Sequence, residues 1–145
     1  MIDLKIKKLS DKAVLPSYGS EFAAGADLYS AEDEIIIKSG ETRLVHTGLA
    51  MQIPEGYVGL IYARSGIATK RGLAPANKVG VIDSDYRGEI MVSIFNHSGE
   101  TQTIAAGERV AQIVITPYLT VNYIEADELD DTLRGEGGFG STATK

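Results

Sequence analysis

Two carboxylates and an aromatic ring stand between two apolar runs in the segment from Gly80 to Gly88. Asp83 and Asp85 point to the same side of an extended backbone, where their like charges repel. A turn rich in Asp and Gly explains this composition without any chemistry, because turns favour both residues. A carboxylate in this position can also act as a general base toward water. From the residues alone, the segment can be either a hairpin turn without a catalytic role or the position of a hydrolytic base.

A second group combines a cation, a hydroxyl and a glycine in the run Arg64-Ser65-Gly66. Guanidinium, hydroxyl and backbone N–H groups at one point favour an anion. A helix cap beside a solvated arginine is the simpler alternative.

Three further polar residues are individually ambiguous. Asp27 fits a turn cap, and Arg109 fits an ion pair with an acid across a turn. Gln112 interrupts an apolar strand pattern, so it must find hydrogen-bond partners if it points inward.

The last part of the chain is rich in glycine and acid. Residues 135–140 match the Gly-x-Gly-x-x-Gly spacing of nucleotide-binding loops, but only five residues follow Gly140. The strand and helix that such a loop needs therefore have no room. A disordered tail is one interpretation. The other is an anion clamp made by Arg134, Ser141 and Thr142 on a lid.

Composition excludes several classes of site. The chain has 145 residues, 43% hydrophobic and 23% charged, which is typical of one globular domain. It has no cysteine and two histidines, so thiolate, Cys-based metal and three-His chemistry are excluded. We interpret His46 and His97 as structural or solvated. A net charge of −6 argues against broad nucleic-acid binding. We expect no membrane span and a cytoplasmic location.

The elements that must position these residues are strands. Alternation in Ile2-Leu4-Ile6 and in Ile90-Val92-Ile94, with several short β-branched runs, is typical of half-buried strands. Glycines recurring at intervals of eight residues supply the turns. The sequence therefore predicts an all-β sandwich or barrel. One short helix is predicted over 65–71, with Ser65 as N-cap and Gly72 as its end.

Taken in order, five segments resemble the five motifs of the trimeric dUTPase family. They are AGADLYS, ARSGIATKRGL, NKVGVIDSDYRGE, GERVAQIVI and RGEGGFGST, between Ala24 and Thr142. The resemblance implies a jelly-roll-like β-barrel (a dUTPase-like β-clip) over 1–124. It also implies a homotrimer, in which an arm of residues 125–145 closes over a neighbouring subunit's site. The family often has glycine after the final Ser-Thr, where this chain has Ala143.

The activity that the resemblance implies is Mg²⁺-assisted hydrolysis of dUTP to dUMP and diphosphate. Such an enzyme limits uracil in DNA and supplies dUMP for thymidylate synthesis. Mg²⁺ usually keeps several waters and uses substrate phosphates as ligands, which suits a chain without a dense carboxylate cage.

The resemblance also assigns roles to single residues. Asp83 resembles the carboxylate that activates the attacking water, and Tyr86 resembles the ring against the deoxyribose. Asp27 resembles the residue that holds Mg²⁺ through water, and Ser65 and Gln112 resemble catalytic phosphate-site residues. The positions that match substrate-binding residues are Arg64, Ser65, Gly66, Asn77, Gly80, Val81, Ile82, Asp83, Tyr86, Met91, Gln112, Arg134, Phe139, Gly140, Ser141 and Thr142.

Two alternatives remain at this point. One is an enzyme related to dCTP deaminase, which ammonia release would reveal. The other is a non-catalytic nucleotide-binding β-sandwich, whose signature is dUTP binding without diphosphate release.

Overall fold

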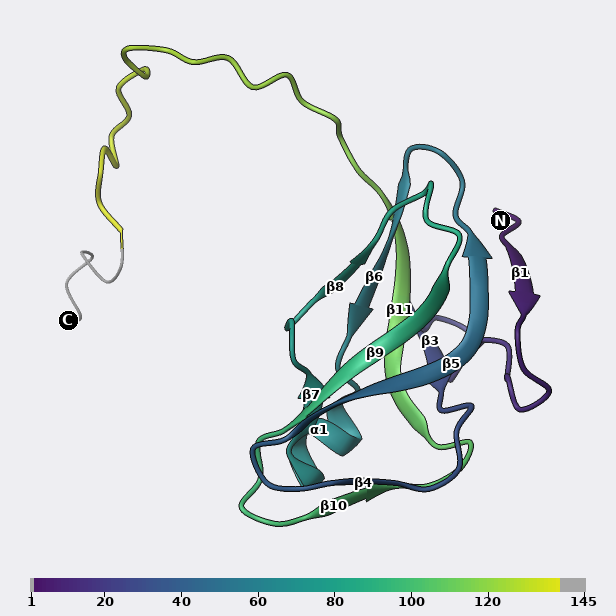
Figure 1. Cartoon of the computed structure of the whole chain (residues 1–145). Helices are drawn as coiled ribbons and strands as arrows, with labels where there is room; N and C mark the ends of the chain where they lie inside the picture. Colours follow the sequence, from purple (N-terminus) through teal and green to yellow (C-terminus); the bar gives the residue numbers. More distant parts are fainter. Residues whose placement is uncertain (1, 139–145) are drawn as a thin grey trace.

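The computed structural model describes residues 2–138, and all of its regular structure except one helix is antiparallel sheet (Figure 1). One sheet has four strands, in the order β1 (Lys5–Lys8), β5 (Thr42–Gln52), β9 (Glu89–Asn96) and β7 (Leu73–Pro75). A second has five, in the order β2 (Ser17–Tyr18), β3 (Ala26–Tyr29), β11 (Arg109–Pro117), β6 (Tyr57–Tyr62) and β8 (Gly80–Ile82). A short pair joins β4 (Ile35–Ile37) to β10 (Gln102–Ile104). The all-β prediction is confirmed, although the described strands form separate sheets rather than one closed barrel.

The alternation along β9 produces the core that the sequence predicts. Ile90, Val92 and Ile94 are buried, whereas the residues between them are partly exposed. These three side chains belong to one buried cluster with side chains from the other strands of both large sheets. Leu28, Val45 and Leu73 in this cluster are fully buried. Each such side chain contributes about 1.5–3 kcal/mol when it leaves water. This shared core fixes the two sheets relative to each other.

The helix α1 spans Ser65–Arg71, as the sequence predicts, and ends at Gly72 with a left-handed φ of 65°. The predicted N-cap is wrong by one residue. Arg64, with extended φ and ψ, occupies the cap position, and no side-chain hydrogen bond caps the helix. Ser65 begins the helix itself, so its exposed hydroxyl remains available.

The two strands that flank the Asp83 turn belong to different sheets. β8 pairs with β6 in the five-stranded sheet, whereas β9 pairs with β5 and β7 in the four-stranded sheet. β8 is an edge strand, so one row of its backbone N–H and C=O groups faces away from β6. A hairpin opened in this way exposes backbone groups to a ligand.

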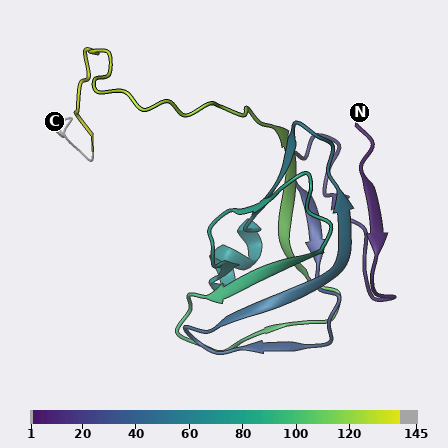
Figure 2. The ribbon, with the colours of Figure 1, turned by 45° about the horizontal axis from the view of Figure 1, so that its top comes forward.

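The chain leaves the sheets after Pro117, before the predicted domain boundary at residue 124. Both views show residues 118–138 leading away from the sheets (Figures 1 and 2). Leu119 and Tyr123 are 90% and 92% exposed there. Among residues 2–138, no helix is long and apolar enough to cross a membrane.

Candidate active site

A buried carboxylate bound by two arginines forms the first part of the site. Asp27 on β3 is only 7% exposed. Its Oδ1 accepts a hydrogen bond from Arg64 Nε at 2.6 Å, and its Oδ2 accepts one from Arg109 Nη1 at 3.3 Å. Gln112 on β11 stands opposite Asp27 on β3 and opposite Tyr62 at the end of β6. Three adjacent strands therefore bring these side chains together.

Gln112 is held between a backbone carbonyl and a glycine. Its Nε2 donates to the Ala63 carbonyl at 2.9 Å. A Cβ at Gly25 would lie 2.4 Å from Gln112 Oε1, so only glycine leaves room for the amide. The polar residue that interrupts the apolar strand pattern thus has the partner that its inward position requires.

These residues line a hollow of about 200 Å³, which we call the phosphate hollow. Its lining residues are Gly19, Ala23, Gly25, Asp27, Arg64, Ser65, Arg109 and Gln112. Two guanidiniums on one carboxylate leave a net positive charge. A polyphosphate can compete with Asp27 for these donors, because charge-assisted bonds to phosphate are strong and bidentate. Of the predicted residues, this hollow unites Asp27, Arg64, Ser65 and Gln112.

The number of side chains that could ligate a metal ion limits the kind of metal site that the phosphate hollow can form. Within the described range, no three His, Cys, Asp or Glu side chains gather closely enough to hold a cation. Among residues 2–138, Asp27 is the only carboxylate that lines the phosphate hollow. Mg²⁺ is commonly bound by one or two carboxylates together with substrate phosphates. The hollow therefore fits a cation that arrives with a polyphosphate, and not an all-protein cage.

The second part of the site lies between β8 and β9, in a hollow of about 270 Å³ that we call the hairpin hollow. Its lining residues are Leu44, Val81, Ile82, Asp83, Tyr86, Glu89 and Met91. Asp83 begins a turn that the Tyr86 N–H closes on the Asp83 carbonyl at 3.2 Å. Asp83 thus stands at the rim of an apolar slot, where it can orient a water against a bound group.

Asn77 lies at the other end of β8. It is exposed and precedes Gly80, which is paired with Ile61. A Cβ at Gly80 would lie 3.4 Å from the Asn77 Nδ2, so the two residues are neighbours. The predicted base-reading residues therefore lie on β8 and on the segments directly before and after it, from Asn77 to Asp83.

The two hollows lie at different positions along β6, since β8 pairs with Gly59 to Ile61 in the middle of the strand and Arg64 follows its end at Tyr62. Ile82, next to Asp83, is paired with Gly59, whereas Arg64 follows Gly59 by five residues along the chain. At about 3.3 Å per residue, the strand from Gly59 to its end at Tyr62 covers about 10 Å, and Arg64 lies two residues beyond that end. Among the described residues, Asp83 and Arg64 line separate hollows that share no residue.

Arg134 is the predicted arm residue that falls within residues 2–138, and it lines neither hollow. Arg134 is exposed in the segment beyond β11, where its Nε donates to the Gly137 carbonyl at 2.6 Å. Phe139, Gly140, Ser141 and Thr142 lie outside the described residues.

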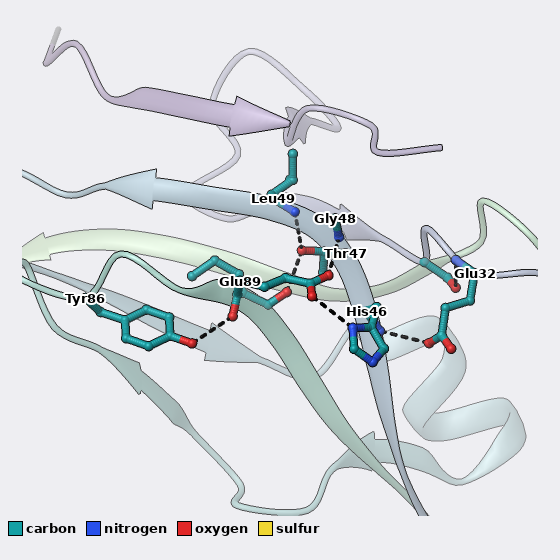
Figure 3. Close-up of polar contacts among 9 residues, drawn as sticks. Glu32, His46, Thr47, Gly48, Leu49, Tyr86 and Glu89 are labelled. Atoms are coloured by element: carbon teal, nitrogen blue, oxygen red, sulfur yellow. Dashed lines mark hydrogen bonds and ion pairs between the residues drawn. The ribbon is translucent and has the colours of Figure 1, made fainter. Parts of the chain in front are cut away.

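Sequence reasoning missed Glu89 and the partner that holds it (Figure 3). The Glu89 carboxylate lies 2.9 Å from His46 Nδ1, and it raises the pKa of His46, mainly through this hydrogen bond. The two residues are 43 positions apart, so only the pairing of β5 with β9 brings them together. His97 packs its ring edge-on against Phe95, as expected for a structural histidine.

Residues 11–143 match the family model described as dUTPase. The deoxyuridine 5'-triphosphate nucleotidohydrolase of Nautilia profundicola is 54% identical over 139 residues, which cover 96% of this chain and 97% of that protein. The protein of the same name from Hydrogenobaculum sp. is 48% identical over 142 residues, covering 98% and 99%.

Solved structures give the same result. The dUTPase of Staphylococcus bacteriophage 80alpha with dUpNHpp has a TM-score of 0.91 and 31% identity, covering 99% of this chain and all of that one. A dUTPase variant from phage phi11 of S. aureus, described as revealing the coordination of a structural Mg(II) ion, has a TM-score of 0.80 and 29% identity, covering 88% and 98%.

Proposed function

The chain belongs to the dUTPase family and hydrolyses dUTP, and from this premise we propose that each active site takes its two hollows from different copies of the chain. The observation that carries the proposal is the separation of Asp83 from Arg64 along β6. A dCTP deaminase or a non-catalytic binding module is not favoured, because the relatives and structures above are named as dUTPases or dUTP nucleotidohydrolases.

In the phosphate hollow, we assign the triphosphate to Arg64, Ser65, Gly66 and Gln112. A triphosphate carries about four negative charges, so its oxygens replace the Asp27 carboxylate as partners of the Arg64 guanidinium. Asp27 is then free to accept hydrogen bonds from the waters of a Mg²⁺ ion, which neutralises phosphate charge when bound. The Ser65 hydroxyl and the Gln112 amide orient the phosphates, so the hollow supplies positioning and charge stabilisation.

In the hairpin hollow, Asp83 takes a proton from water as the water attacks the α-phosphate, and diphosphate leaves. The outward row of β8 backbone groups, with Asn77, reads the uracil edge by its pattern of donors and acceptors. Val81, Ile82 and Met91 enclose the base, and the Tyr86 ring covers the deoxyribose. An unmatched buried polar edge, such as that of cytosine, is rejected strongly, because its partners stay unpaired.

We propose a homotrimer, because a head-to-tail interface that closes into a ring brings one hollow of each copy to the other hollow of the next. Two surfaces of one chain support association. Leu119, Val121 and Tyr123 alternate along the exposed segment after β11. A largely apolar hollow of about 460 Å³ lies between β1, β2 and β11. We further propose that Arg134, Phe139, Gly140, Ser141 and Thr142 cover the nucleotide from the arm, and that the enzyme acts in the cytoplasm, where deoxynucleotides are made.

Complementation tests the divided site. Asp83→Asn and Arg64→Ala chains, carrying different affinity tags, are co-expressed and purified on both tags. If the site takes Asp83 from one copy and Arg64 from the next, a mixed trimer holds about one intact site in three. Diphosphate release at about a third of the wild-type rate is expected, with each parent inactive. Mixed trimers as inactive as the parents would show that the site is intramolecular, and a mass by light scattering other than trimeric would refute the assembly.

Substrate choice is tested separately, by diphosphate release from dUTP, dTTP, dCTP, dATP, dGTP and UTP with Mg²⁺. Release from dUTP far above that from the other five nucleotides, with dUMP as coproduct, is expected. Ammonia release from dCTP would favour the deaminase alternative.

A further inference from the structure

The Glu89 carboxylate connects the hairpin hollow to strand β5 by two hydrogen bonds (Figure 3). Its Oε2 lies 2.9 Å from His46 Nδ1, and its Oε1 accepts the Gly48 N–H at 2.8 Å. Both oxygens therefore have a partner on the same strand. The side chain is 22% exposed, and that of His46 is 47% exposed, so the contact is within reach of solvent.

The partners of Glu89 lie in a part of β5 where the pairing with β9 is irregular and where buried contacts fix the backbone. The pairing of β5 with β9 shifts between His46 and Ala50. Thr47, which is fully buried, donates from its hydroxyl to the Ile90 carbonyl at 2.5 Å. Gly48 has a φ of 66°, and a Cβ there would lie 2.9 Å from that of Ala13. This bulge turns the Gly48 N–H toward Glu89, and a larger residue cannot replace the glycine without strain.

On its other side, Glu89 holds Tyr86. The Tyr86 hydroxyl donates to the Glu89 backbone carbonyl at 3.0 Å. A Cβ at Gly88 would lie 2.4 Å from the Tyr86 hydroxyl oxygen, so the ring lies directly on the glycine. The orientation of Tyr86 therefore depends on where the backbone at Gly88 and Glu89 is held.

We propose that Glu89, held by His46 and Gly48, is a positioning residue for Tyr86 and so sets the preference for dUTP over UTP. The inference rests on the proposed contact of Tyr86 with the deoxyribose. A ring that rejects a 2′-hydroxyl by contact must be held to within a fraction of an ångström, because small displacements relieve the clash. Glu89 supplies this constraint without touching the nucleotide's reacting atoms.

The same contact makes the preference depend on pH. Two carboxylates face His46, that of Glu89 from β9 and that of Glu32, which accepts the His46 backbone N–H at 2.8 Å. The Glu89 hydrogen bond is the main cause that raises the pKa of His46, opposed by desolvation. The protonated ring binds Glu89 most strongly, so the dUTP preference is expected to decline as the pH rises through this pKa.

The first test compares kcat/KM for dUTP and UTP in Glu89→Ala and in a control, Glu41→Ala. The Glu41 carboxylate also accepts a backbone N–H, that of Lys38 at 2.8 Å, but lies outside both hollows. In Glu89→Ala we expect the dUTP-to-UTP ratio to decrease about tenfold, mainly through gain of UTP turnover, and in the control no change. Equal loss for both nucleotides, with the ratio unchanged, would overturn the proposal. Glu89→Gln, which keeps an acceptor, covers the case that Glu89→Ala does not fold, and it is expected to restore part of the ratio.

A double-variant cycle separates this inference from the function assigned to Tyr86. Tyr86→Ala should lower the ratio by itself, and adding Glu89→Ala should lower it no further, because both act through one ring. If Tyr86→Ala leaves the ratio unchanged, the assigned role of Tyr86 fails. If Tyr86→Ala lowers it and Glu89→Ala does not, only the positioning role of Glu89 fails.

His46→Gln tests the pH dependence, because glutamine keeps an N–H donor that does not titrate. The dUTP-to-UTP ratio of wild type is measured between about pH 6 and pH 9, where histidine changes charge. We expect a decline in wild type and a flat profile in His46→Gln. A flat wild-type profile, or the same decline in the variant, would overturn the role of His46.

Discussion

The phosphate hollow and the hairpin hollow present different kinds of groups to a ligand. In the first, the long charged side chains of Arg64, just before α1, and Arg109, at the start of β11, converge on the buried Asp27. In the second, an edge strand offers backbone groups and a turn offers Asp83. Charge tolerates small displacements, whereas a pattern of hydrogen bonds to a base does not. In the site that we propose, side chains bind the part common to every nucleotide and backbone groups bind the part that distinguishes the bases.

The largest expected effect separates chemistry from binding in the hairpin hollow. Asp83→Asn should lower kcat about 10³-fold, because the base toward water is lost, while the shape of the slot stays. The affinity for a non-hydrolysable dUTP analogue, measured by calorimetry, should remain within a factor of a few. Retention of most of the activity would remove Asp83 from the role of base.

A smaller effect tests whether the phosphate hollow contributes equally to kcat/KM for nucleotides with different bases. Arg64→Ala should lower kcat/KM about 10²-fold for dUTP and for dCTP alike, because the guanidinium contacts only phosphate. The measurement is diphosphate release from both nucleotides. A changed dUTP-to-dCTP ratio would contradict the assignment of phosphate binding to one hollow and of base recognition to the other.

A still smaller effect comes from crowding Gln112. Gly25→Ala places a methyl group 2.4 Å from Gln112 Oε1, so the amide must move. We expect about a tenfold loss of kcat/KM with the dUTP-to-UTP ratio unchanged. Gly99→Ala is the matched control, since a Cβ there meets nothing within 4 Å. Equal activity of the two variants would show that Gln112 does not need its present position.

The smallest effect is on stability, and it concerns the hairpin hollow. Glu89 raises the pKa of His46 above its ordinary value of 6.5. The stabilisation is therefore fully present below pH 6.5 and is lost as the pH rises through the raised pKa. Urea unfolding of His46→Gln should show a deficit against wild type at pH 6 that disappears by pH 9, below about 1 kcal/mol because solvent screens a half-exposed pair. A deficit that grows with pH would have the wrong sign.

Sequence patterns predicted what depends on local spacing. The alternation in β9, the short helix and its end at Gly72 all follow from periodicity and backbone preference. Arg109 was expected to pair with an acid across a turn, but it pairs instead with Asp27 on the neighbouring strand β3, 82 residues away. The roles of single residues in the two hollows stay predictions that rest on the resemblance.

Sequence patterns did not predict what depends on strand pairing. Nothing local indicates that the two strands around Asp83 enter different sheets, or that Glu89 meets His46. The displacement of the N-cap from Ser65 to Arg64 has a similar cause, because Arg64 is held by Asp27 on another strand.

The opened hairpin has a consequence for how the protein exchanges its amide protons. Since β8 pairs on one side only, its amides divide into a row that faces β6 and a row that faces away from it. The first row reports the unfolding of the sheet. If β8 reads the base as proposed, we expect the second row to exchange with solvent in the free enzyme and to be protected when a pyrimidine binds. Hydrogen exchange at the three residues of β8 can therefore report both the integrity of the fold and the occupancy of the site.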